Sequence, residues 1–167
     1  MARPAGAGDM FLMVKGATHG LINGESQDDK HKGEIEVLSW SWGIQGKAAL
    51  GGGAATGKAI IREMKIIKKV DKASTALMGA VRTNETIKEA VLTLRKTGKT
   101  ALEYLKITME QGRIVSLDIE AGDPSGGLDL VERITLSFNK ISVEYTPQGA
   151  DGQPQGGTTF QDQWGDK

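Results

Sequence analysis

The sequence predicts one mainly β domain, an antiparallel barrel or sandwich with a single short helix. Seven or eight segments alternate apolar and polar residues, short turn sequences separate most of them, and one stretch alone spaces its apolar residues as a helix does. A chain of 167 residues, 38% of them apolar, can bury a core of its own without disulfides or a structural metal. We therefore expect one domain.

The expected elements follow from apolar spacing and from glycine, proline and asparagine at the turns. Strands are expected over residues 10–14, 35–44, 60–70, 90–94, 105–109, 115–119, 128–138 and 141–145. Turns are expected at residues 97–99, 111–112 and 123–126, and loops at 16–33 and 46–57. The leader, residues 1–8, and a Gly- and Gln-rich tail, residues 149–167, show no such alternation, and both are expected to be flexible.

Three local features refine this outline. A helix of two to three turns fits Ser74 to Thr83, with Asp71 and Ser74 as possible N-caps. The apolar residues change parity after Phe138, so a bulge or sharp bend is expected near Asn139-Lys140. In the strand over residues 35–44, alternation puts two apolar sets on opposite faces, so this strand is expected to be covered on both. The sets are Ile35 and Val37, and Leu38, Trp40, Trp42 and Ile44.

Composition excludes several functional classes. The chain has no Cys and only His19 and His31, so we expect no disulfide, no thiolate nucleophile, no metal site and no cofactor. The formal net charge is zero, so nucleic acid and membrane surfaces are not expected partners. The apolar run Met10 to Val14 is too short for a Sec signal, and no stretch is long enough to span a bilayer, so synthesis in the cytoplasm is expected.

Two motifs suggest enzymes but fail on their context. Residues 52–58 satisfy the spacing of a phosphate-binding loop, yet Ala59 stands where that loop needs Ser or Thr, and a strand pattern follows instead of a helix. Ser125 lies in a Gly-rich turn, and the possible bases, His19 and His31, both lie in one distant loop. The sequence therefore predicts that the protein is not an enzyme.

Two other features leave alternatives open. Trp40 and Trp42 could form the platform of a monomeric binding module, although core or subunit packing explains them better. Charge is unevenly distributed, and a basic edge of one copy could meet an acidic edge of the next, or these side chains could be solvated strand faces. The candidate edge residues are Arg62, Lys65, Lys68, Lys69, Glu103 and Glu110.

Several distinctive motifs follow one another from about Asp9 to Gln148. They are Gly24-Glu25-Ser26, Asp29, His31, Gly33 to Gly43, Gly57-Lys58, Val70 to Ser74, Glu103 to Ile107, Ile114 to Ser116, Ile134 to Phe138 and Tyr145 to Gln148. Together they closely resemble the haemolysin-coregulated protein (Hcp) family, which forms the inner tube of the bacterial type VI secretion apparatus. The resemblance covers most of the chain.

The resemblance implies a barrel of two curved sheets with one helix, over residues 9–148, assembled as six-membered rings that stack into a tube related to phage tail tubes. A phage-type tail tube protein is the near alternative. It also implies small effectors in the lumen, spike, sheath and baseplate components as partners, and export by the apparatus without a cleaved signal.

Two sets of residues acquire expected roles from this resemblance. An extended loop that projects toward a neighbouring subunit or ring would contain Gly46, Lys47, Leu50, Gly51, Gly52, Gly53, Gly57 and Lys58. A strand of the barrel wall would contain Ile35, Val37, Leu38, Ser39, Trp40, Ser41, Trp42 and Gly43.

Overall fold

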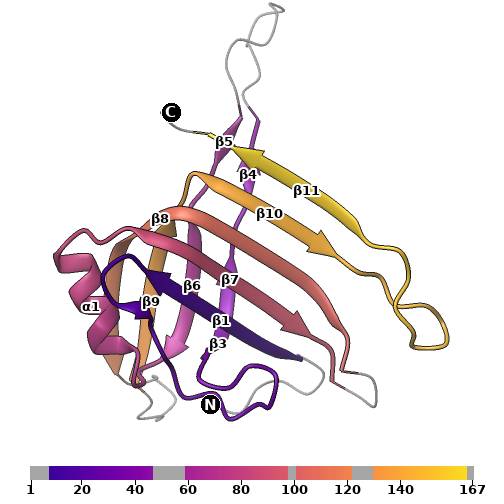
Figure 1. Cartoon of the computed structure of the whole chain (residues 1–167), viewed down its shortest axis with the longest axis horizontal. Coiled ribbons are helices and arrows are strands. Elements are labelled where there is room, and N and C mark those ends of the chain that lie inside the picture. Colours follow the sequence, from indigo (N-terminus) through magenta and orange to yellow (C-terminus); the bar gives the residue numbers. More distant parts are fainter. Residues whose placement is uncertain (1–7, 47–58, 98–100, 122–129, 165–167) are drawn as a thin grey trace, which may run out of the picture.

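The computed structural model describes residues 8–46, 59–97, 101–121 and 130–164 (Figure 1). The elements are β1 (Asp9–Gly16), β2 (Gly20–Leu21), β3 (Ile35–Ser41), β4 (Ile44–Gln45), β5 (Ile60–Ile61), β6 (Met64–Lys69), α1 (Ser74–Arg82), β7 (Ile87–Arg95), β8 (Glu103–Ala121), β9 (Leu130–Ser137), β10 (Lys140–Tyr145) and β11 (Thr158–Gln163). Residues 1–7 of the predicted leader, most of the loop over residues 46–57, residues 98–99 of the turn over residues 97–99 and the whole turn over residues 123–126 lie outside the described residues.

Six antiparallel strands close into a barrel. Their order is β8-β7-β1-β3-β6-β9, and pairing between β8 and β9 closes the circle. The first half of β8 also pairs with β10, which pairs with β11, so two further strands extend the sheet beyond the barrel (Figure 1). The predicted mainly β fold, an antiparallel barrel with one helix, is confirmed.

The helix and the barrel strands share one core. Leu77 and Ala80 of α1 are buried, and α1 lies against β8, so it covers one side of the barrel (Figure 1). The helix spans Ser74–Arg82, which confirms the predicted element to within one residue. The largest fully buried apolar side chains come from five strands of the wall as well as from α1 and β10: Leu12, Ile35, Met64, Ile66, Leu77, Ile87, Leu92, Ile107, Met109 and Ile141.

The hairpin predicted at Gln111-Gly112 is wrong, because β8 runs without reversal from Glu103 to Ala121. Gln111 adopts a φ of 56°, which bends the strand where its partner changes from β10 to β9. A Cβ on Gly112 would lie 2.3 Å from the carbonyl oxygen of Ser137, so glycine here permits close approach of two backbones. The Gln-Gly pair therefore marks a bend within a strand.

The bend predicted near Asn139-Lys140 is confirmed. Strand β9 ends at Ser137 and β10 begins at Lys140. Phe138 and Ile141 are both buried although they have opposite parity, as the change of pattern requires.

The prediction that Trp40 lies on the opposite face of its strand from Val37 is wrong. The register between β3 and β6 shifts between Val37 and Ser39, so Leu38 occupies a bulge. Beyond the bulge, Trp40 pairs with the buried Ile66 and points to the same side as Val37. Trp40 and Trp42 are half-buried against the core, which confirms core packing for both tryptophans.

The C-terminal segment, expected to be a flexible tail, contains the exposed strand β11, Thr158–Gln163. Strand β11 pairs with β10 along its whole length, from Tyr145–Thr158 to Lys140–Gln163. Trp164 then packs edge to face on Phe138, with ring centroids 5.6 Å apart, and Phe138 lies 6.5 Å from Trp42. This aromatic cluster fixes the end of β11 on the barrel.

Candidate functional site

A short two-stranded ribbon, formed by β4 and β5, projects from one end of the barrel (Figure 1). At its base, the indole N–H of Trp42 donates to the carbonyl oxygen of Arg62 at 2.8 Å, and the Arg62 amide donates to the Gly43 carbonyl at 3.0 Å. Ile44 and Ile60 on the ribbon are 43% and 45% exposed. The ribbon is thus anchored by hydrogen bonds and offers apolar side chains to the surroundings.

The predicted projecting loop begins at the end of this ribbon. Gly46 is exposed and follows β4, whereas Lys47, Leu50, Gly51, Gly52, Gly53, Gly57 and Lys58 lie outside the described residues. The strand β5 begins at Ile60, two residues after Lys58, so a strand and not a helix follows the phosphate-loop pattern. A hollow of about 440 Å³ at the base of the ribbon is lined by Trp42, Arg62 and Lys65, among others.

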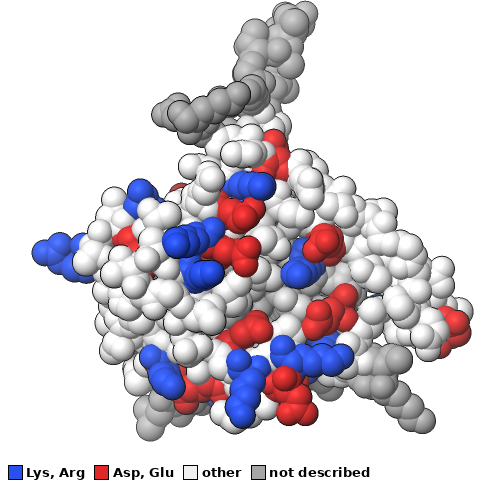
Figure 2. Space-filling model, in the orientation of Figure 1, with Lys and Arg blue, Asp and Glu red and all other residues white. Residues whose placement is uncertain are grey.

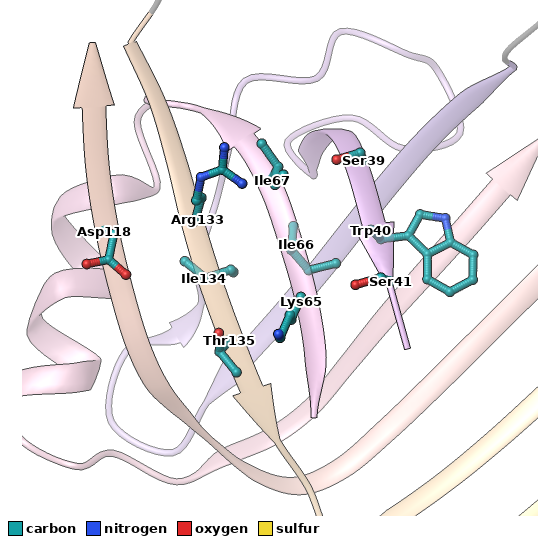
Figure 3. A pocket seen from close by; sticks show the side chains of 10 residues that line it. All are labelled: Ser39, Trp40, Ser41, Lys65, Ile66, Ile67, Asp118, Arg133, Ile134 and Thr135. Atoms are coloured by element: carbon teal, nitrogen blue, oxygen red, sulfur yellow. The ribbon is translucent and has the colours of Figure 1, made fainter. Parts of the chain in front are cut away.

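A second hollow, of about 390 Å³, lies on the outer face of β3, β6, β9 and the second half of β8. Figure 3 shows Ser41, Lys65, Arg133 and Asp118 around it, while Trp40 points away on the other side of its strand. Arg133 Nε lies 2.6 Å from Glu120 Oε1, and both side chains are about half exposed. This face of the barrel is therefore polar and carries both signs of charge.

The motif strand forms part of the barrel wall, as the family resemblance implies. Ile35 and Val37 are buried, and Leu38, Trp40, Trp42 and Gly43 are half-buried. Ser39 and Ser41 are exposed and line the outer hollow. The strand thus supplies a core on one side and a small polar surface on the other.

The candidate charged-edge residues fall into three groups: exposed residues, residues paired within the chain, and one buried residue, Lys68. Arg62, Lys65 and Lys69 are exposed. Glu103 and Glu110 have partners within the chain, namely His31 at 2.6 Å and Lys140 at 3.4 Å. On the face shown in Figure 2, basic and acidic side chains are interspersed, so charges of opposite sign largely neighbour one another there.

The prediction that Lys68 lies at a charged edge is wrong, because its side chain is fully buried. Its ammonium group contacts Glu132 Oε2 at 2.9 Å, Asp71 Oδ1 at 2.8 Å and Ser74 Oγ at 3.3 Å. Ser74 also donates to Glu132 Oε2 at 2.5 Å. The cluster joins β6, β9 and the start of α1. Sequence reasoning missed it, although Lys68 shares the parity of the buried Met64 and Ile66.

Both histidines are held by carboxylates. His31, 8% exposed, has Nδ1 2.8 Å from Glu34 Oε2 and Nε2 2.6 Å from Glu103 Oε1. His19 Nδ1 lies 2.6 Å from Glu85 Oε1, and the amides of Thr18 and His19 each donate to Glu85 Oε2 at 2.9 Å. These contacts fix loops on the barrel.

The loop that carries His31 is also anchored by its own carboxylate, Asp28. Asp28 binds Arg95 through both carboxylate oxygens, at 2.6 and 2.9 Å. The Arg95 guanidinium holds the pKa of Asp28 at about 2. Burial raises the pKa of Glu85, but hydrogen bonds from His19 and Thr18 outweigh it and keep this pKa below 4.5.

The described residues contain neither a metal-binding cluster nor a membrane-spanning helix. No three His, Asp or Glu side chains are grouped there in a way that could hold a metal ion. No helix among these residues is long and apolar enough to cross a membrane. The closed barrel, its anchored ribbon and its carboxylate-held loops place the chain in the class of small antiparallel β-barrel proteins.

Comparison with known proteins identifies the family. The model for "Type VI secretion system effector, Hcp" matches residues 11–145. The chain is 38% identical over 152 residues to the protein hcp1 of Pseudomonas aeruginosa, covering 89% of this chain and 90% of that protein. The chain therefore belongs to the Hcp family of type VI secretion, a family of structural tube proteins rather than enzymes.

Solved structures agree with this assignment. A structure described as a type six secretion system protein has a TM-score of 0.80 and 25% identity, and the match covers 91% of this chain and 92% of the other. Hcp1 from Salmonella typhimurium has a TM-score of 0.71 and 29% identity, with 93% of this chain and 95% of the other covered.

Proposed function

We propose that this chain is the subunit of a type VI secretion inner tube, in which six copies form a ring, rings stack, the lumen carries small effector proteins, and the protein is itself exported. Membership of the Hcp family is the observation that carries this proposal.

Two surfaces of the barrel support self-association. The ribbon extends from the barrel with Ile44 and Ile60 exposed, and such apolar side chains are more stable when another surface covers them. Strand β11 is an edge strand with one acidic residue and no proline or lysine, so it lacks the features that usually protect an edge from pairing. Phe160 on this strand is 42% exposed.

The first test is the molar mass in solution, measured by light scattering behind a sizing column, with negative-stain images of the same fraction. A closed ring of six copies would weigh about 107 kDa, six times the 17.8 kDa chain. Annular particles at this mass would support the proposal. A monomer at every accessible concentration, with no rings in the images, would contradict ring formation by the chain alone.

The ribbon is tested by substitution. Ile44→Asp combined with Ile60→Asp should lower the fraction of rings or stacks, because charged groups then occupy surfaces that a neighbour must cover. Leu21→Asp is a matched control, since Leu21 is 59% exposed on the separate strand β2. Equal effects of the ribbon and control variants would argue against a role of the ribbon in assembly.

A further inference from the structure

The loop over residues 24–33, which precedes β3, is closed by its own backbone hydrogen bonds. The Gly24 amide donates to the Gly33 carbonyl at 2.8 Å, and the Gly33 amide donates to the Ser26 carbonyl at 2.9 Å. The loop lies at the end of the barrel away from the ribbon (Figure 1). Three of its side chains contact the rest of the protein: Glu25 accepts a hydrogen bond from the Lys72 amide at 2.7 Å, Asp28 binds Arg95, and His31 contacts Glu103.

His31 bridges two carboxylates that come from different parts of the chain. Glu34 follows the same loop, and Glu103 begins β8, 72 residues away. The imidazole also stacks on Phe11 of β1, with ring centroids 4.4 Å apart and an angle of 9° between the planes. A ring in this position satisfies both carboxylates only when both of its nitrogens carry a proton.

We propose that this loop is a pH-dependent latch, closed by the imidazolium of His31 between Glu34 and Glu103, and loosened from β8 when the ring loses its proton. A neutral imidazole has one N–H and one lone pair, so one of the two carboxylates would face a lone pair at short distance. Loss of the proton therefore replaces a charge-assisted hydrogen bond with repulsion.

The direction of the pH effect follows from the groups around the ring. Burial lowers the pKa of His31, but the hydrogen bonds that its ring donates to Glu103 and Glu34 outweigh it, so this pKa is raised above 6.5. The protonated ring therefore contributes its full stabilisation to the closed latch below pH 6.5. This contribution is lost as the pH rises through the raised pKa of His31.

Other charged groups surround the latch. Asp28 is paired with Arg95 of β7, and Arg95 also contacts Asp9 of β1 at 2.9 Å. On β3, Glu36 pairs with Phe11 and is exposed. Because the Asp28–Arg95 pair remains ionised, it still holds one part of the loop at high pH. Opening is therefore confined to the part that contains His31.

The test is amide hydrogen exchange on the whole chain, at about pH 6 and about pH 9, with each rate corrected for the intrinsic effect of pH. We expect protection of the loop amides to fall several-fold or more between the two conditions, while protection of β7, the internal reference, stays constant. In His31→Gln, loop protection should be low at both. Protection in the unmodified protein that does not change between the two conditions would overturn the proposal.

Two further variants separate the latch from a general loss of stability. His19→Gln removes the other imidazole of the chain and should leave the pH dependence of the loop intact. Glu103→Gln keeps the size of the side chain and removes its charge, so it should lower the titration midpoint of His31 in carbon-13 NMR and flatten the exchange profile. An unchanged midpoint in Glu103→Gln would also overturn the proposal. These readouts concern the single chain, so they are independent of whether rings form.

Discussion

Lys68 Nζ lies 2.9 Å from Glu132 Oε2, and both side chains are completely buried. Buried charges are stable only when they are paired and hydrogen-bonded, and here Asp71 and Ser74 complete the set around the ammonium group. Because these residues come from β6, β9 and the segment that opens α1, the cluster links the helix to the barrel wall.

Lys68→Met should destabilise the protein by roughly 3–5 kcal/mol, because it leaves the Glu132 carboxylate buried without a counter-charge. The measurement is the free energy of unfolding from urea denaturation. The double variant Lys68→Met with Glu132→Leu should recover part of the loss, since it removes the buried Glu132 carboxylate, although Asp71 still loses its contact with Lys68.

Lys65→Met is the matched control for this prediction. Lys65 lies on the same strand but is exposed, so its removal should change the free energy of unfolding by about 0.5 kcal/mol or less. If Lys68→Met costs no more than Lys65→Met, the buried cluster does not contribute to stability as the geometry implies.

Gly112→Ala should destabilise the barrel by about 1–3 kcal/mol, because the added methyl would lie 2.3 Å from a backbone oxygen that cannot move freely. The thermal unfolding midpoint measures the loss. Gly46→Ala is the control, since a methyl there meets nothing within 4 Å. Similar midpoints for the two variants would show that β8 and β9 can separate at the bend without cost.

The fold class could be predicted because alternation of apolar residues follows directly from the geometry of a half-buried strand. The same pattern even located the bend after Phe138, where the parity changes. It misplaced Trp40 because the bulge at Leu38 inserts one residue and reverses the faces beyond it, and only pairing with β6 reveals the insertion. The hairpin predicted at Gln111-Gly112 is wrong for a related reason, since a turn sequence can also bend a continuous strand.

The functional residues were harder to predict from the sequence than the fold. Lys68 was assigned to a charged edge because lysine is rarely buried, and its partner Glu132 is 64 residues away. Its parity with Met64 and Ile66 was the available signal. The latch at His31 depends on Glu103, 72 residues away, so no local pattern could have shown the contact.

Trp164→Ala should loosen β11, because it removes the ring that packs on Phe138 and fixes the end of this strand. Amide exchange of residues 158–163 should become faster, while the barrel strands keep their protection. Phe160→Ala is the control within the same strand, since Phe160 is 42% exposed and should matter less in the monomer. Unchanged exchange in Trp164→Ala would mean that pairing with β10 alone holds β11.

Glu85→Gln should reduce the loss of stability that the protein shows in acid. The pKa of Glu85 in the folded state lies below 4.5, so its charge stabilises the fold above that pH, and this contribution is lost as the pH falls through the lowered value. The side-chain amide that replaces this carboxylate would still accept hydrogen bonds from Thr18 and His19 but would not titrate. Urea denaturation midpoints between about pH 3 and about pH 6 should therefore be lower for Glu85→Gln at the upper end and converge with those of the unmodified protein in acid. Parallel profiles over the whole range would mean that the charge of Glu85 contributes nothing to acid stability.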